Sequence, residues 1–238
     1  MKVRIVAAVV LLCSLALPAE AQWKKILGKL AKKENPAALS NEKIASGLKE
    51  ALRVGTENTV KETGREDGFL GNEIIRLPLP ENIRKLEKTL RAVGQGKRLD
   101  EFVVSLNRAA ERAAPAAKEI FWDAILQMTF SDVQKIFKGG DTAATDFFRE
   151  KTGPRLMEAF LPVVKEATAE VGVTREYKKL TDAARSVPFM RVELTDIDEY
   201  VVGKALDGLF YVLGEEEKKI RKNPAARVTN LLKEVFGK

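Results

Sequence analysis

The chain has 238 residues, a formal net charge of +7, no histidine and one cysteine, Cys13. Without histidine, the Ser-His-Asp and Cys-His arrangements of nucleophilic enzymes are excluded. If Cys13 is removed with a leader, as argued below, disulfides and zinc sites of the cysteine-histidine type are excluded as well. Any catalysis would have to use carboxylates, lysine, tyrosine or serine.

Residues 1–21 have the pattern of a secretory signal peptide. Two basic residues precede an apolar run over residues 5–17, and residues 19–21 form a small-x-small cleavage site. The run is shorter than the roughly 18 residues that a membrane-spanning helix needs. We therefore expect cleavage near Ala21 and a periplasmic or secreted protein, with an uncleaved N-terminal anchor as the alternative.

The segment after the predicted cleavage site, residues 22–33, has the pattern of an amphipathic helix at a membrane surface. Its apolar residues Trp23, Ile26, Leu27 and Leu30 would share one face, and Lys24, Lys25, Lys29, Lys32 and Lys33 would occupy the rest. We expect contact with an anionic membrane surface or another envelope polyanion. Docking on the protein's own domain and disorder are the alternatives, and export argues against nucleic acid as a partner.

The next part of the chain is a proline-containing linker over residues 34–39, followed by a mainly helical region. From residue 40 onward, apolar residues recur at three- and four-residue spacing, which predicts helices. A first helix is expected over residues 40–64, and a glycine-rich loop over residues 64–72. Residues 73–80, EIIRLPLP, are expected to be extended, because two prolines remove amide donors and restrict their neighbours.

The remaining elements are predicted from capping residues and prolines. Helices are expected to begin near Pro80, Leu99, Ser131, Asp141, Pro154, Thr174, Thr195 and Pro224, with a restart at Pro115 and a kink at Pro162. A second extended piece, residues 187–194, could pair with residues 73–80 as a small two-stranded ribbon. The prediction is an all-α fold: a single globular multi-helix bundle over residues 40–238 with a short extended insertion.

Five stretches along the chain carry a family resemblance. They are GLKEALRVGTENTVKETGREDGFLGNEIIRLPLP, SLNRAAERAAPAAKEIF, GGDTAATDFFREKT, YVVGKALDGLF and IRKNPAARVTNLLKEVFG. In this order they resemble a bacterial exported family catalogued as domain of unknown function 4197, over roughly residues 40–237. The resemblance implies one helical domain behind a signal peptide. It implies no activity and no functional residue, and it does not reach residues 22–33.

One candidate polar cluster lies in the stretch LNRAAERAAP. Asn107 and Glu111 are one helical turn apart on the same face, and Arg108 begins the adjacent row. As a functional site, these residues would line a cleft in which burial poises the Glu111 carboxyl group. We favour the alternative, a buried hydrogen-bonded network or an exposed ion-pair face, because no second catalytic partner is identifiable.

The glycine-rich loop is a second candidate, since functional residues often lie on loops. It offers Asp67 and Asn72 beside Phe69. The alternative, which we again favour, is a structural loop whose glycines allow tight turns while Phe69 fills the core. Asp207, which lies in an apolar stretch, is expected to pair with Lys204 or with an arginine that faces it.

These observations favour a non-enzymatic envelope protein that binds a lipidic small molecule or a protein partner and contacts anionic membrane. Two alternatives stay open: a hydrolase that uses Glu111 and a second carboxylate in a cleft, and a structural or assembly factor without a ligand. We expect neither a metal site nor a cofactor.

Overall fold

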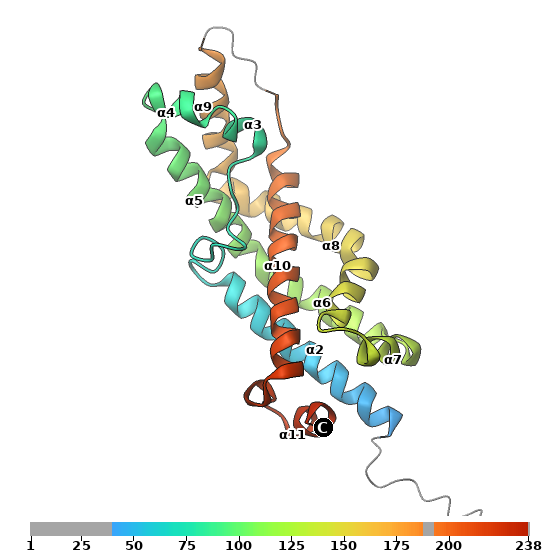
Figure 1. The fold of residues 1–238 in the computed structure, drawn as a ribbon. Coiled ribbons are helices and arrows are strands. Elements are labelled where there is room, and N and C mark those ends of the chain that lie inside the picture. The colour runs from blue at the N-terminus through green and yellow to red at the C-terminus, as the bar shows by residue number, and fades with distance from the viewer. Residues whose placement is uncertain (1–39, 188–192, 238) are drawn as a thin grey trace, which may run out of the picture. The chain divides into compact units, whose positions relative to one another are not determined.

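The regular structure is helical throughout residues 40–187 and 193–237, the part of the chain that this computed structural model describes. The predicted all-α fold is confirmed (Figure 1). The α-helices are α2 (Asn41–Gly64), α3 (Glu81–Arg84), α4 (Glu87–Ala92), α5 (Gly96–Ala113), α6 (Ala117–Gln127), α7 (Phe130–Lys138), α8 (Ala143–Glu170), α9 (Val173–Arg185), α10 (Ile197–Lys222) and α11 (Asn230–Phe236). Two short 3-10 turns, Ala114–Ala116 and Pro224–Ala226, precede α6 and α11.

Helix α10 is the centre of the bundle. It packs against α8, α2 and α5, and it lies between α5 and α8 in Figure 1. Phe121 of α6 makes edge contacts with Phe148 of α8 and Phe210 of α10, with ring centroids 6.3 and 5.7 Å apart. Aromatic pairs of this kind each add about 0.5–1.5 kcal/mol beyond the area they bury, so these rings tie three helices together.

Helix α5 packs closely against its neighbours because its inward face changes from large residues in its first half to alanines in its second half. Leu99, Phe102 and Leu106 are fully buried, and so are Ala109 and Ala110. The alanines allow the main chain of another helix to approach, and α5 contacts both α8 and α9. The same helix carries the polar cluster described below.

Two predicted helix caps were wrong by one or two residues. Helix α7 is capped by Thr129, not Ser131: the Thr129 hydroxyl accepts a bond from the Asp132 amide, and the Asp132 carboxylate accepts one from the Thr129 amide. Helix α10 is capped by Asp196, not Thr195, since the Asp196 carboxylate accepts from two first-turn amides. In both places a neighbouring residue that can also cap a helix accepts hydrogen bonds from the unpaired amides of the first turn.

Helix α8 differs more strongly from the prediction. Asp141 was expected to cap one helix and Pro154 to begin another, but a single helix runs through both Pro154 and Pro162. Asp141 instead forms an ion pair with Lys222. Phe148, Leu156, Phe160 and Val164 of α8 are buried along its length. We attribute the continuity to this packing, which outweighs the local cost of the prolines.

The C-terminal part also begins later than predicted. Pro224 opens only a 3-10 turn, and α11 starts at Asn230, where the Thr229 hydroxyl accepts a bond from the Leu232 amide. The start of α3 after Pro80 agrees with the prediction.

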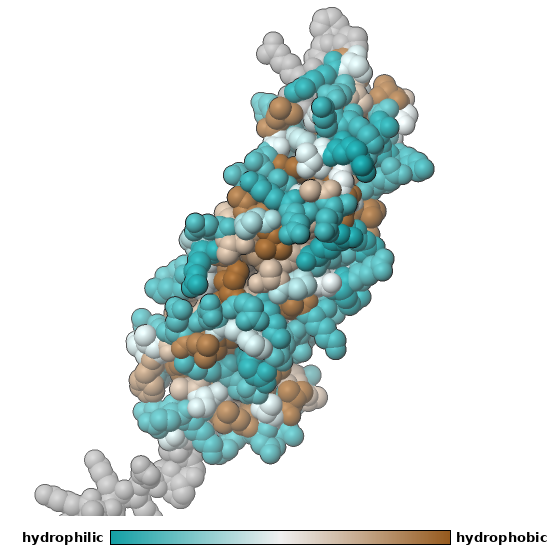
Figure 2. Space-filling model, turned by 180° about the vertical axis from the view of Figure 1, so that it is seen from behind, coloured by the Kyte–Doolittle hydropathy of each residue, from teal (hydrophilic) through white to brown (hydrophobic). Residues whose placement is uncertain are grey.

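The expected extended segment is present only in part. Residues 73–75 form turns, and residues 76–80 are extended without strand pairing in the described structure. Its proposed partner, residues 187–194, overlaps residues 188–192, which lie outside the described residues. None of the helices in the described ranges is long and apolar enough to cross a membrane. Seen from behind (Figure 2), hydrophobic residues gather in several small areas among hydrophilic ones.

Candidate functional site

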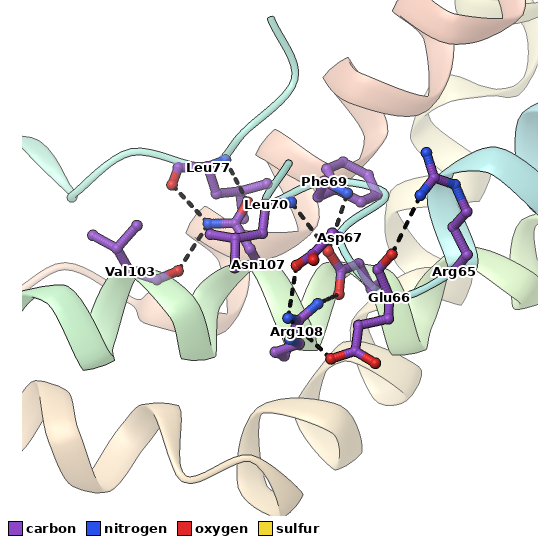
Figure 3. Close-up of polar contacts among 10 residues, drawn as sticks. Arg65, Glu66, Asp67, Phe69, Leu70, Leu77, Val103, Asn107 and Arg108 are labelled. Atoms are coloured by element: carbon purple, nitrogen blue, oxygen red, sulfur yellow. Dashed lines mark hydrogen bonds and ion pairs between the residues drawn. The ribbon is translucent and has the colours of Figure 1, made fainter. Parts of the chain in front are cut away.

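The predicted polar cluster and the predicted loop form one site. Asn107, Arg108 and Glu111 of α5 face the segment between α2 and α3, residues 65–80, which has no regular helix or strand (Figure 3). The sequence placed these groups on two separate elements, and the structure brings them into direct contact.

Glu111 holds the beginning of this segment. Its side chain is only 4% exposed. One carboxylate oxygen, Oε1, accepts bonds from the amides of Phe69 and Leu70 at 3.1 and 3.0 Å. The other, Oε2, accepts a bond from Nη1 of Arg108 at 2.6 Å. A buried amide without a partner costs about 1–3 kcal/mol, so this one side chain removes two such costs.

Arg108 connects the buried carboxylate to the surface. Its Nη2 donates to Asp67 Oδ1 at 2.7 Å and lies 3.3 Å from Glu66 Oε1. The hydrogen bond to Glu111, followed by the bond to Asp67, raises the pKa of Arg108. Asp67 has a φ of 60°, in the left-handed region that few residues other than glycine adopt. The bond from Arg108 therefore holds a turn that is unfavourable by itself.

Asn107 holds the other end of the segment. It is fully buried, and its Oδ1 accepts a bond from the Leu77 amide at 2.8 Å. Its Nδ2 donates to the carbonyl oxygens of Leu77 and Val103 at 3.0 and 2.8 Å. Asn107 thus gives Leu77 the amide and carbonyl partners that a neighbouring β-strand would give.

Phe69 and Asn72, the other two loop candidates, have different roles. Phe69 is fully buried and lies against Gly208 of α10, where an added Cβ would come within 2.5 Å of its ring. Asn72 does not join the cluster: its Oδ1 accepts a bond from the Ile74 amide, within the loop itself. Phe69 thus anchors the loop in the core, and Asn72 shapes its outer turn.

The chemistry of the site is that of main-chain anchoring. The Glu111 oxygens already accept three hydrogen bonds. The hydrogen bonds that Asn107 and Arg108 make are directed at the segment or at α5 itself. Within residues 40–187 and 193–237, no group of three acidic or cysteine side chains is arranged to hold a metal ion. The expected pairing of Asp207 is confirmed, since Arg149 lies 3.2 Å and Lys204 3.8 Å from its carboxylate oxygens.

A second buried glutamate was not predicted. Glu217 of α10 accepts bonds from the amides of Ala144 and Thr145 at 3.0 and 2.9 Å, in the first turn of α8. The Thr145 hydroxyl and Nε of Arg221 also donate to it, each at 2.9 Å. The sequence does contain a sign of this role, because Glu217 continues the apolar stripe through Leu213 and Ile220.

A hollow between α2 and α6 was also missed. It is lined by Ser46, Lys49, Glu50, Arg53, Trp122, Ile125 and Leu126. The sequence gives little indication of this hollow, because Trp122 and Leu126 are one turn apart on a helix that also has a buried face. The predicted membrane-contact residues, Trp23 to Lys33, lie outside the described residues, as does the predicted signal peptide.

Comparison with known proteins places the chain in a family. No curated protein matches it, and no solved structure matches it. The sequence model of the family described as "Protein of unknown function (DUF4197)" matches residues 38–237, in agreement with the resemblance found in the sequence. Since the match covers most of the chain, this protein belongs to the DUF4197 family.

Proposed function

We propose that the protein is an exported bacterial envelope protein whose helical domain is a non-enzymatic binding module. One observation carries the proposal: the buried polar side chains that could have served catalysis, Asn107 and Glu111, have the main chain of residues 65–80 as their partner. They stabilise a scaffold. What the scaffold leaves open to a partner is its surface, including the hollow between α2 and α6.

The hydrolase alternative is less well supported. A glycosidase-like site needs two carboxyl groups about 5–10 Å apart across an open cleft, with one free to exchange a proton. Glu111 is 4% exposed and its oxygens are occupied by two amides and Arg108. Its neighbour Asp67 is bound to the same arginine. Both carboxylates are thus paired with one arginine in this arrangement.

The proposal includes contact with an anionic membrane surface through residues 22–33. Each lysine near an anionic leaflet contributes about 1 kcal/mol, and Trp23 suits the headgroup region. The mature protein should sediment with vesicles that contain an anionic phospholipid and should stay in solution with neutral ones. The expected binding should weaken as the salt concentration rises.

Charge reversal gives the decisive comparison. One variant replaces Lys24, Lys25, Lys29, Lys32 and Lys33 with glutamate. The matched control makes the same change at five exposed lysines of the domain, Lys61, Lys88, Lys165, Lys178 and Lys233. The first variant should lose vesicle binding and the second should keep most of it. Equal binding by the first variant would overturn the membrane contact.

Native mass spectrometry of the mature protein, purified from its own envelope without detergent, tests the binding module itself. A co-purifying small molecule or protein of defined mass would support the proposal. Repeated recovery of the bare chain would instead favour the structural or assembly factor without a ligand.

A further inference from the structure

The hollow between α2 and α6, which we call the Trp122 groove, has one apolar wall and one charged wall. Trp122, Ile125 and Leu126 of α6 form the apolar wall, and α2 contributes Lys49, Glu50 and Arg53 opposite them. Its cavity volume is about 260 Å³, and it is open to solvent. That is just below the range of about 300–1,000 Å³ typical of sites for drug-sized molecules, so a ligand has to be small or slender.

The apolar wall is exposed mainly at Leu126, since Ile125 is only 5% exposed and Trp122 is half-buried. Leu126 is 74% exposed, the highest value among the large hydrophobic residues that the structure describes. Phe130, at the start of α7, is 49% exposed. Single exposed hydrophobic residues are common on protein surfaces. Here, however, Leu126 lines a hollow, and exposed apolar area beside a hollow can mark a binding site.

Two lysine ammonium groups beside the groove have no carboxylate partner in the part of the chain that the structure describes. Lys49 Nζ makes only a long bond of 3.4 Å to the Leu126 carbonyl oxygen, and Lys118 Nζ lies over the Trp122 ring, 4.3 Å from its centroid. Neither forms an ion pair with any residue in the described ranges. Arg53, by contrast, is neutralised by Glu50 and Glu57. The net charge beside the apolar wall is therefore positive.

Trp122 also carries the one buried side-chain nitrogen or oxygen, among the described residues, that has no hydrogen-bond partner. The indole Nε1 donor is covered by protein, although a buried tryptophan N–H usually finds an acceptor. Because this donor is covered, a ligand in the groove does not reach it. The groove itself offers apolar surface and two cations, and both favour a ligand with an apolar chain and an anionic oxygen-bearing head group.

We propose that the Trp122 groove binds a single-chain amphiphile with an anionic head group, a long-chain carboxylate. Its chain would lie along Trp122, Ile125 and Leu126, and its head group would be held by Lys49 or Lys118. A single chain is favoured because α6 offers one row of apolar side chains. The inference rests on the proposed binding function and names the ligand class for one site of the domain.

Trp122 itself provides the measurement. The mature chain holds two tryptophans, so a Trp23→Phe background leaves Trp122 as the reporter. Titration with laurate below its micelle concentration should change the fluorescence of Trp122 saturably, whereas butyrate and dodecyltrimethylammonium should not. The proposal is wrong if the fluorescence change of Trp122 with laurate never saturates, or if the cationic amphiphile gives the same change.

Two substitutions in that background test the two halves of the site. Lys49→Glu should weaken laurate binding about tenfold, because it replaces an attracting charge with a repelling one. Leu126→Ala should weaken it about threefold through lost apolar contact. The matched controls are Lys88→Glu on α4 and Met157→Ala on α8, both exposed and away from the groove. Equal losses in variants and controls would overturn the assignment, and circular dichroism shows whether each variant is folded.

The failures of this inference and of the proposed function are distinguishable. If laurate does not bind but native mass spectrometry finds another ligand, the groove assignment is wrong and the binding module stands. If Trp122 responds only to anionic vesicles and not to laurate, the groove contacts a membrane surface and the single-chain ligand is excluded. The charge reversal in residues 22–33 changes none of the residues that line the groove, so we expect laurate binding to be unchanged.

Discussion

Glu111 on α5 and Glu217 on α10 are two buried glutamates with nearly the same surroundings. Each accepts bonds from two consecutive main-chain amides that are distant in the sequence. Each is also paired with an arginine of its own helix, Arg108 three residues before Glu111 and Arg221 four residues after Glu217. The arginine neutralises a charge that would otherwise be costly to bury.

The two sites differ in what the amides belong to. Those at Glu217 begin α8, where the first-turn amides always lack a helical partner and the helix dipole favours a negative charge. Those at Glu111 belong to a loop with a left-handed residue, Asp67, and no regular structure beyond short turns. Glu217 adds stability to α8, a helix that already has its own main-chain hydrogen bonds. Glu111 instead supplies hydrogen bonds to a loop that has few of its own. A buried carboxylate beside an arginine is therefore no sign of catalysis by itself.

The largest expected effect is the loss of stability on removing Glu111. Glu111→Ala should lower the free energy of unfolding by about 3–5 kcal/mol, because it leaves two amides and part of the Arg108 charge unpaired. Glu217→Ala should cost less, about 2–3 kcal/mol, since α8 keeps its later bonds and Arg221 keeps the Ile136 carbonyl oxygen. Urea denaturation of both variants measures the difference.

Glu119→Ala is the control for this pair. Glu119 is exposed on α6, so its removal should change stability by less than about 0.5 kcal/mol. If the Glu217 variant is the less stable of the two, the loop depends less on its glutamate than the helix start does, and the distinction between the sites is wrong.

Glycines of α10 test the same contrast through packing. Gly208 faces the loop, where an added Cβ would lie 2.5 Å from Phe69 Cε1. Gly214 faces the start of α8, where a Cβ would lie 3.5 Å from Thr142 Cγ2, an ordinary contact. Gly208→Ala should therefore destabilise by about 1–3 kcal/mol, whereas Gly214→Ala should be neutral or stabilise by up to about 1 kcal/mol. Thermal and urea unfolding measure both.

Gly203 gives the internal reference on the same helix. No atom outside its own neighbourhood lies within 4 Å of an added Cβ, so Gly203→Ala reports helix propensity alone, a gain of about 0.5–1 kcal/mol. A Gly208 variant as stable as the Gly203 variant would mean that Phe69 is not held tightly against α10.

The sequence predicted the helix that carries Asn107 and Glu111 better than it predicted the main-chain groups that these two side chains bind. The spacing of Asn107 and Glu111 places both on one face of α5, and this follows from helix geometry. Their partners lie 30 and 42 residues away in the chain, and no local pattern specifies that contact. Glu217 was missed for the same reason, although its place on an apolar stripe could have suggested a buried role.

The prolines of α8 show a case in which local sequence rules predicted a helix boundary that tertiary packing removes. Pro154 lacks an amide and normally begins or breaks a helix, so the sequence predicted a boundary there. Phe148 and Leu156 on either side of it are buried against the rest of the bundle. The continuous helix is a result of tertiary packing, which a single sequence does not reveal. By contrast, the end of α2 at Gly64 was predicted correctly because glycine and the end of the apolar stripe coincide.

A smaller loss of stability than those at Glu111 and Glu217 is expected at a third anchor of the loop segment, the hydroxyl of Tyr200. The Tyr200 hydroxyl donates to the Pro78 carbonyl oxygen at 2.7 Å, and burial raises the pKa of Tyr200 to about 12. Tyr200→Phe should lower the free energy of unfolding at neutral pH by about 1 kcal/mol, through loss of this bond. Urea denaturation at neutral pH measures the loss.

Alkaline pH tests the same anchor through the ionisation of Tyr200. The unfolded chain loses the Tyr200 proton near the ordinary pKa of about 10, whereas the folded protein keeps it until about 12. Deprotonation therefore favours the unfolded state in this window, so the contribution of Tyr200 is present below pH 10 and is lost as the pH rises towards 12. The difference in unfolding free energy between wild type and Tyr200→Phe should shrink over that range. Tyr211→Phe, at an exposed site on the same helix, is the matched control for loss of a tyrosine hydroxyl at neutral pH. A constant difference would mean that the Pro78 carbonyl is held by other contacts, leaving Glu111 and Asn107 as the anchors on which the loop depends.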